Sequence, residues 1–356
     1  MNIVGLIVGS HFLFLCLLLC PFFSSVTYSL DLRNEVLKQI AVDLDPYKDS
    51  GIRSADLDLL FEAEKKANSS LLVKFTIKNN TLTIANPSKN CRALPIVKAI
   101  HAILRRTKLP NMTFLATMHD YLDNNKFSVP IFSFAKLKTT PHIILIPDFE
   151  ALSGNYPFFQ ELEQGKARFP WHVKKDQIFW RGNTTGGLFT AQNFLNFPRS
   201  RAVCLSFKYP HLINARYTDL CQCSDREYIK KTYSHFFSNL VAVKEHLLYK
   251  YQLLIDGNSC AYSRAYWQLF SECVLFKQSS SSIQWYYRGL QPFVHYIPLQ
   301  ADLNDLPQWI LWAQKHDKEC RQIADRAHAF ARKNLSHEQV LEYLHLLLIE
   351  YAKLQR

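Results

Sequence analysis

The stretch at residues 253–267, LLIDGNSCAYSRAYW, indicates the fold class of this chain. An apolar run ends at Asp256, small residues follow, and a segment with helical spacing that contains Arg264 completes the stretch. An apolar strand that leads through a loop into a helix is the repeating unit of α/β proteins. In open α/β sheets, ligands bind at the carboxyl ends of strands, and helix starts favour phosphates. Ser259 and Arg264 are therefore placed to hold a diphosphate, although a strand–turn–helix joint with a solvated arginine fits equally well.

The rest of the chain repeats this alternation. Residues 31–70 have helical spacing, and residues 71–86 alternate apolar and polar around two asparagines, which predicts two strands joined by a turn. MTFLATMHD (112–120) and PHIILIPDF (141–149) are short apolar runs that end in polar residues, as buried parallel strands do. Four later runs also predict strands: DQIFWRG (176–182), YKYQLLIDG (249–257), CVLFKQ (273–278) and FVHYIPL (293–299). The chain is thus predicted to be α/β, closed by one or two amphipathic helices.

Composition narrows the range of partners. The chain has 356 residues, of which 48% are hydrophobic and 20% charged, as in a globular protein of roughly two domains. The net charge of +12 favours an anionic partner, but the basic residues are scattered, so we expect no nucleic-acid partner. The charged stretch at 165–176 predicts a boundary. We expect domains over 30–170 and 171–330, followed by a C-terminal helix at 331–356.

The N-terminus carries an uncharged apolar run, IVGLIVGSHFLFLCLLLCPFF, at residues 3–23. It has about the length needed to span a bilayer. The first lysine or arginine is Arg33, so the basic n-region of a signal peptide is missing. We predict that segment 1–29 is an uncleaved membrane anchor of undetermined orientation. A cleaved signal peptide, and hence a secretory or lumenal protein, is the alternative.

Metal-binding motifs are weak. The Asp-Leu-Asp triplets at 43–45 and 56–58 could hold a divalent metal, but they lie in amphipathic, helix-like sequence. Cys221 and Cys223 lack a second pair of ligands for zinc. Seven cysteines lie outside the apolar run, an odd number, and most are predicted to be reduced. We expect no metal site, and His295 is predicted to be a packed histidine.

Two more stretches carry candidate chemistry. The stretch FWRGNTTGG, residues 179–187, follows an apolar run. It contains Arg181 and three glycines. Such a loop can bring N–H groups close to a phosphate, and a guanidinium matches its oxygens, but alone the stretch fits an ordinary turn better. In FLATMHDYLD, residues 114–123, Asp120 follows a short apolar strand, where a carboxylate can act as a general base. Taken alone, a helix-capping aspartate is the stronger interpretation.

Taken together in order, these segments resemble glycosyltransferase family 90, the family of capsule-associated, lipopolysaccharide-modifying and protein O-glucosyltransferases. The likeness covers most of the chain after the apolar run and is densest over 171–310. The motifs are IPDF (146–149), WRGNTT (180–185), INARYTD (213–219), HLLYKYQLLIDGNSCAYSR (246–264) and CVLFKQSSSSIQWYYRGLQPFVHYIPLQADLNDL (273–306). Their common order is far more specific than any single motif.

The resemblance implies a GT-B architecture, with two Rossmann-like domains facing each other across a cleft. It implies transfer of a sugar such as glucose or xylose from a UDP-sugar, with inversion and no required metal or cofactor. Asp120, followed by Tyr121, matches the family's general base. The donor-binding positions that it implies are Arg181, Gly182, Thr184, Arg199, Asp256, Ser259, Ser263 and Arg264. The resemblance also shifts the interpretation of residues 179–187 from a turn to a phosphate-binding loop.

The chain departs from the animal branch of the family in two places. An arginine that follows Arg-Gly in that branch is replaced by GGLFT (186–190), which leaves Arg199 or Arg201 to reach the donor. Leu247 and Leu248 stand where a lumenal relative has a disulfide cysteine. The resemblance to the bacterial branch favours a saccharide acceptor such as lipopolysaccharide or capsule, with a protein serine as the alternative. A non-catalytic carbohydrate- or partner-binding protein is the alternative function.

Overall fold

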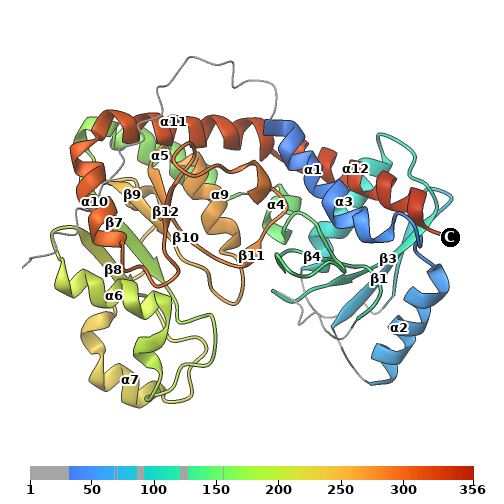
Figure 1. Ribbon diagram of the computed structural model, residues 1–356, viewed down its shortest axis with the longest axis horizontal. Coiled ribbons are helices and arrows are strands. Elements are labelled where there is room, and N and C mark those ends of the chain that lie inside the picture. Colours follow the sequence, from blue (N-terminus) through green and yellow to red (C-terminus); the bar gives the residue numbers. More distant parts are fainter. Residues whose placement is uncertain (1–31, 68, 70, 86–91, 121–126, 155) are drawn as a thin grey trace, which may run out of the picture.

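The computed structural model describes residues 32–67, 69, 71–85, 92–120, 127–154 and 156–356. It confirms the α/β class: two five-stranded sheets occupy the two halves of the molecule, with helices packed around them (Figure 1). The predicted anchor at 1–29 lies outside the described residues. Within those residues, no helix combines the length and the apolar character needed to cross a membrane.

The first sheet has the order β2-β1-β3-β4-β6. Its strands are β1 (Leu72–Lys78), β2 (Thr81–Ala85), β3 (Met112–Thr117), β4 (Ile131–Ser133) and β6 (Ile143–Leu145). The predicted strand pair is a hairpin, and Asn79 and Asn80 at its turn have the positive φ of 51° and 62° that a tight hairpin turn requires. Strands β3, β4 and β6 are parallel, but β1 runs antiparallel to β3. The sheet is therefore mixed: an antiparallel hairpin extends a parallel core.

The second sheet is wholly parallel, as predicted, in the order β12-β10-β9-β7-β8. Its strands are β7 (Lys175–Gly182), β8 (Ile213–Tyr217), β9 (Tyr249–Leu254), β10 (Val274–Gln278) and β12 (Ile297–Leu299). All six residues of β9 are buried, because helices cover both faces of a parallel sheet.

Helices surround both sheets. Around the first sheet they are α1 (Leu32–Leu44), α2 (Ser54–Lys66), α3 (Ala93–Leu104), α4 (Phe149–Ser153) and the C-terminal α12 (His337–Leu354). The second sheet is surrounded by α5 (Phe158–Arg168), α6 (Pro198–Lys208), α7 (Arg226–Thr232), α8 (Val243–His246), α9 (Tyr262–Phe270), α10 (Leu306–Lys315) and α11 (Asp317–Asn334) (Figure 1). The C-terminal segment thus forms two helices, one of the predicted possibilities.

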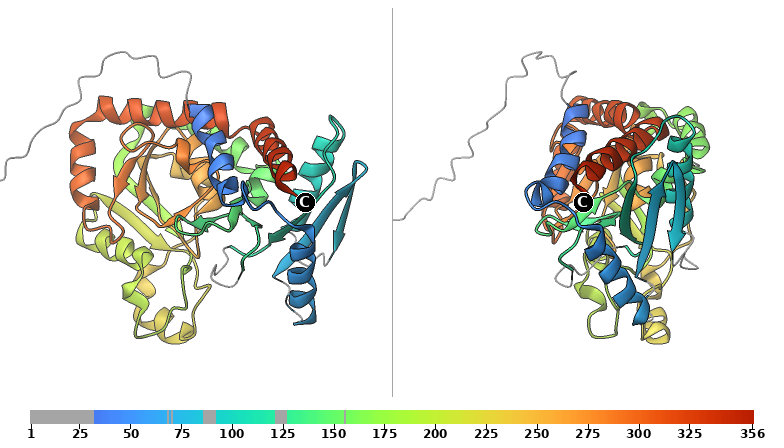
Figure 2. Two further views of the ribbon diagram at one scale, coloured as in Figure 1. Left: turned by 45° about the vertical axis from the view of Figure 1, so that its right-hand side comes forward. Right: turned by 90° about the vertical axis from the view of Figure 1, so that its right-hand side faces the viewer.

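The C-terminus returns to the first sheet. Helix α11 lies along the second half and leads into α12, which sits beside α1 on the first half (Figure 2). The hydroxyl of Tyr351 donates to the carbonyl of Thr113 at 3.2 Å. One cluster of buried hydrophobic residues around the first sheet also takes in α9 and α12, and a second cluster surrounds the second sheet. The predicted domain limits stay predictions.

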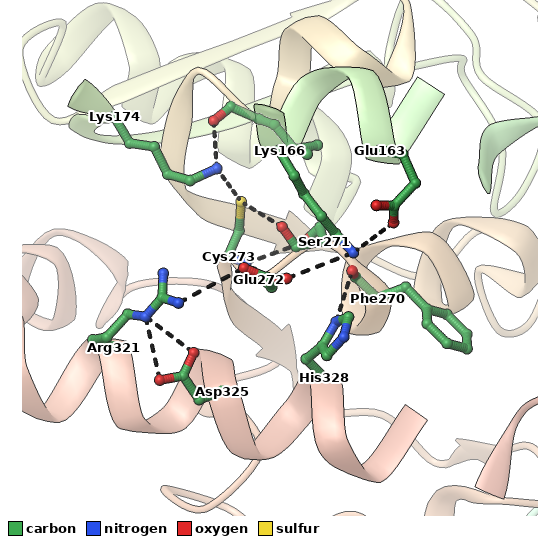
Figure 3. Close-up of polar contacts among 11 residues, drawn as sticks. Glu163, Lys166, Lys174, Phe270, Ser271, Glu272, Cys273, Arg321, Asp325 and His328 are labelled. Atoms are coloured by element: carbon green, nitrogen blue, oxygen red, sulfur yellow. Dashed lines mark hydrogen bonds and ion pairs between the residues drawn. The ribbon is translucent and has the colours of Figure 1, made fainter. Parts of the chain in front are cut away.

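The corner between α9 and β10 is held from two sides (Figure 3). Glu272, in the left-handed conformation at φ 55°, lies 3.6 Å from the ammonium of Lys166 on α5 and 3.7 Å from the guanidinium of Arg321 on α11. The Nδ1 of His328 on α11 lies 3.0 Å from the carbonyl oxygen of Phe270. These contacts fix the carboxyl end of α9, the helix whose amino end carries Arg264.

Candidate active site

A cavity of about 690 Å³ lies between the two halves, where strands of both sheets end. Its lining comes from the residues after β3, β7, β8 and β9: His119, Asp120, Gly186, Gly187, Leu188, Cys221, Gln222, Cys223 and Asn258. This is the edge at which open α/β sheets bind ligands. The structure therefore brings Asp120 together with two loops predicted from separate stretches, the glycine loop (residues 183–187) and the serine loop (residues 256–261).

Asp120 is held from both halves of the molecule. Its Oδ1 lies 2.8 Å from the guanidinium of Arg92, and its Oδ2 accepts a hydrogen bond from Nδ2 of Asn258 at 2.9 Å. Its backbone carbonyl accepts hydrogen bonds from the hydroxyls of Ser259, at 2.9 Å, and Tyr262. The carboxylate thus has a fixed orientation at the cavity wall, as a general base requires. Tyr121, the other half of the predicted motif, lies outside the described residues.

Asn258 joins this carboxylate to the glycine loop. Its Oδ1 accepts the backbone N–H of Gly186 at 3.1 Å, and Oε1 of Gln222 accepts the same N–H, also at 3.1 Å. Gly186 has a φ of +107°, and a Cβ there would lie 3.1 Å from the carbonyl oxygen of Gly257. A glycine is therefore required where the two loops meet. Asn258 was not among the predicted site residues, because nothing local in the sequence distinguishes it from another turn asparagine.

Two arginines converge on the ring of Trp180, at the end of β7. The guanidinium carbons of Arg199 and Arg264 lie 5.7 Å and 5.9 Å from the ring centroid. Arg199 donates to the carbonyl of Asn183 at 2.7 Å and to that of Asp256 at 3.0 Å, so it ties the glycine loop to the serine loop. This geometry distinguishes Arg199 from Arg201, whose guanidinium contacts Asn304.

The same two arginines are buried cations, and among the described residues neither forms an ion pair with a carboxylate. Burial lowers the pKa of Arg264 to about 9, with the nearby Arg199 as a second cause, and burial lowers the pKa of Arg199 to about 10. Nη2 of Arg264 donates to the carbonyl of Arg181 at 2.5 Å. Its Nη1 is buried without a hydrogen-bond partner among the described residues. A buried cation with a spare donor is suited to an anionic ligand.

Arg181 is turned elsewhere. Its Nη1 and Nη2 donate to the backbone carbonyl and the side-chain oxygen of Asn214 on β8, at 3.1 Å and 2.9 Å. The guanidinium stacks 4.3 Å from the ring centroid of Phe179, and burial lowers its pKa to about 10. Successive residues of a strand point to opposite faces, so Arg181 faces away from the ring of Trp180. The structure does not bring its side chain to Arg199 and Arg264.

The other predicted donor-binding residues mainly shape the loops. The buried Thr184 hydroxyl accepts the N–H of Cys221 at 2.8 Å. The carbonyl of Gly182 accepts the N–H of Thr218 at 2.9 Å. Ser263 hydrogen-bonds to the carboxylate of Glu150 in the first half.

Asp256 also turns away from the cavity that holds Asp120. Burial raises the pKa of its carboxyl group, against the lowering effect of Lys277 and of a hydrogen bond from Ser280. Of the two predicted serines, Ser259 and Ser263, only Ser259 contacts Asp120 among the described residues: its hydroxyl donates to the backbone carbonyl of Asp120. No described residues form a group of three or more side chains suited to a metal ion.

Comparison with known proteins identifies the family. The family model for glycosyl transferase family 90 matches residues 34–356. The chain belongs to glycosyltransferase family 90. The resemblance drawn from the motifs is thereby confirmed over nearly all of the described chain.

Several relatives and solved structures are similar to this member of the family. It is 29% identical to protein O-glucosyltransferase 2 of Danio rerio, over 82% of this chain and 57% of that protein. It is 26% identical to human protein O-glucosyltransferase 1, over 69% of this chain and 63% of that protein. The chain thus spans less than two thirds of the length of either relative. Anabaena HepE in complex with UDP and glucose matches 71% of this chain and 74% of its own at a TM-score of 0.42 and 10% identity, too distant to assign any residue.

Proposed function

We propose that this family 90 member is an inverting glycosyltransferase of GT-B type. It would move a sugar, glucose or xylose, from a UDP-sugar to an acceptor hydroxyl, with Asp120 as the general base and without a metal. One observation carries the proposal: the carboxylate of Asp120 shares a cavity with the glycine and serine loops, next to the arginine pair Arg199 and Arg264.

The proposed mechanism follows from this arrangement. Asp120 takes the proton of the acceptor hydroxyl while the oxygen of that hydroxyl forms a bond to the anomeric carbon of the donor sugar. The bond from that carbon to the diphosphate oxygen breaks, and the leaving UDP takes the electron pair. Arg264, with its spare Nη1 donor, and the loop N–H groups stabilise the charge that grows on the diphosphate. Removing one such donor costs about 3–4 kcal/mol in the transition state.

The acceptor is proposed from the comparisons. The relatives are named as protein O-glucosyltransferases, which supports a serine hydroxyl of a protein as the acceptor. The motifs at 256–259 and 277–287 favour a saccharide instead. Either acceptor presents one hydroxyl to the same base, so an assay with both classes separates them without changing the proposed chemistry.

The first experiment is a thermal shift of the full chain with UDP, UDP-glucose and UDP-xylose, each with and without EDTA. A ligand at 100 times its Kd stabilises the folded state by about 2.7 kcal/mol, or about 5–10 °C for this size. We expect a shift that survives EDTA, disappears in Arg264→Ala and persists in the control Arg105→Ala, which changes an exposed arginine. A folded protein that responds to no nucleotide would refute the donor site.

The second experiment separates the enzyme from a binding protein that keeps the fold. Asp120→Asn should retain UDP binding and lose sugar transfer to peptide and saccharide acceptors, because the amide cannot take the proton. UDP binding without turnover in the wild type, unchanged by Asp120→Asn, would support the non-catalytic alternative.

A further inference from the structure

A second cavity, of about 290 Å³, lies at another part of the junction between the two halves. It is lined by Lys138, just after β5 (Lys136–Leu137) in the first half, and by Lys277 and Ser280 at the end of β10 in the second half. Strand β5 pairs there with β11 (Ser282–Ile283). Among the described residues, this cavity shares no lining residue with the one that holds Asp120.

The lining of this cavity is strongly cationic. Lys138, Lys277 and Arg288 all face it, and none of the described residues that line it carries a carboxylate. Arg288 lies 3.4 Å from Glu35, a partly exposed pair at the rim that neutralises little in water. The negative charge that acts on Lys277 most strongly is the carboxylate of the buried Asp256. Two ammonium groups and a guanidinium therefore surround one concave space.

The two lysines also act on each other. Burial lowers the pKa of Lys277, and the neighbouring charge of Lys138 lowers it further, while Asp256 raises it. The ammonium of Lys277 stays in place over two rings, 4.6 Å from the centroid of Tyr287 and 6.0 Å from that of Tyr296. Like charges that line one cavity repel each other, and an anion bound between them removes that repulsion.

We propose that this cavity binds a phosphate group, at a site separate from the one proposed for the UDP-sugar. Its volume is near the lower end of small-molecule sites, enough for a phosphate with a sugar attached. A phosphate has the charge and the several acceptor oxygens that two lysines and an arginine can bind together. Because Lys138 belongs to one half and Lys277 to the other, the bound phosphate bridges the two halves.

The test uses the full chain and two probes, inorganic phosphate and glucose 6-phosphate, titrated in a thermal-shift assay at constant ionic strength. The pocket variant is Lys138→Ala/Arg288→Ala, because both side chains are exposed and their loss leaves the core intact. The control is Lys230→Ala/Lys231→Ala on α7, two exposed lysines whose loss changes the net charge equally. UDP is titrated against all three proteins.

We expect phosphate to stabilise the wild type and the control, and to bind the pocket variant at least about tenfold more weakly, as the loss of charged hydrogen bonds implies. The UDP response should be the same in all three proteins. A tighter response to glucose 6-phosphate would assign the site to a phosphate carried by a saccharide, and an equal response would assign it to free phosphate.

Three results would overturn the proposal. They are no response of the wild type to either probe, an equal loss in the pocket variant and the control, or a UDP response that disappears with the phosphate response. The last would make the cavity part of the donor site. Because UDP is measured separately, failure of this proposal and failure of the proposed donor site give different results.

Discussion

The amide of Asn258 is expected to align the base with the glycine loop. Asn258→Ala removes a hydrogen bond of 2.9 Å to the carboxylate of Asp120 and one of 3.1 Å from the N–H of Gly186. A hydrogen bond to a charged group contributes about 1.5–3 kcal/mol. If that energy serves to orient the base in the transition state, kcat falls by roughly 10–100-fold.

The matched control for this variant is Gln222→Ala. Gln222 accepts the same N–H of Gly186, also at 3.1 Å, but its side chain does not hydrogen-bond to Asp120. The loop alone is therefore loosened in Gln222→Ala, whereas Asn258→Ala loosens the loop and also frees the base. We expect kcat to fall only in Asn258→Ala, with UDP binding little changed in both variants.

The assay is steady-state release of UDP, with Kd for UDP measured independently by calorimetry. Equal losses of kcat in the two variants would show that only the loop matters and would refute the alignment by Asn258. A rise in KM with an unchanged kcat would also refute it, because uniform binding, and not the transition state, would then be affected. Asn258→Gln, which keeps the amide, should recover part of the activity.

The remaining predictions concern stability. Lys136→Met leaves the buried Asp43 without the ammonium that now lies 2.5 Å away. This should lower the free energy of unfolding by about 3–5 kcal/mol and Tm by about 6–20 °C. The control Lys138→Met, at an exposed lysine, should change Tm little, and equal Tm values of the two variants would contradict the prediction. Burial raises the pKa of Asp148 to about 7, above its unfolded value, so its contribution to stability is present at low pH and is lost as the pH rises from about 4 to 7. Asp148→Asn, which keeps a helix-capping side chain, should therefore gain stability relative to the wild type across that range in pH-dependent unfolding, and a constant difference would refute the assignment.

Much of the fold was predictable because its signals are local. The hairpin of β1 and β2 follows from two alternating runs around Asn79 and Asn80, and the buried strands of the second sheet follow from short apolar runs. Strand β4 (Ile131–Ser133) was missed because three residues are too few to show a period. The antiparallel pairing of β1 with β3 was also missed, because the hydrophobic pattern of a strand does not show which strand it pairs with.

The candidate site was predictable only in pieces. The motifs indicated Asp120 and Arg264 separately, and the structure places Asp120 at the junction of the two halves and Arg264 against the end of β7. Arg181 was predicted from its place in a family motif, yet its side chain lies with Asn214, because its direction is set by the pleat of β7 and by the neighbouring strand.

The sequence by itself determined the α/β class, the family and the residue types available for phosphate and proton chemistry. Only the tertiary structure decided that Asn258 contacts Asp120 across 138 residues of chain, that Arg199 ties the glycine loop to the serine loop, and that Lys138 faces Lys277 across a cavity. Local patterns report which face of a strand or helix is buried. They carry no information on which distant loops meet, because that depends on how the two sheets pack against each other.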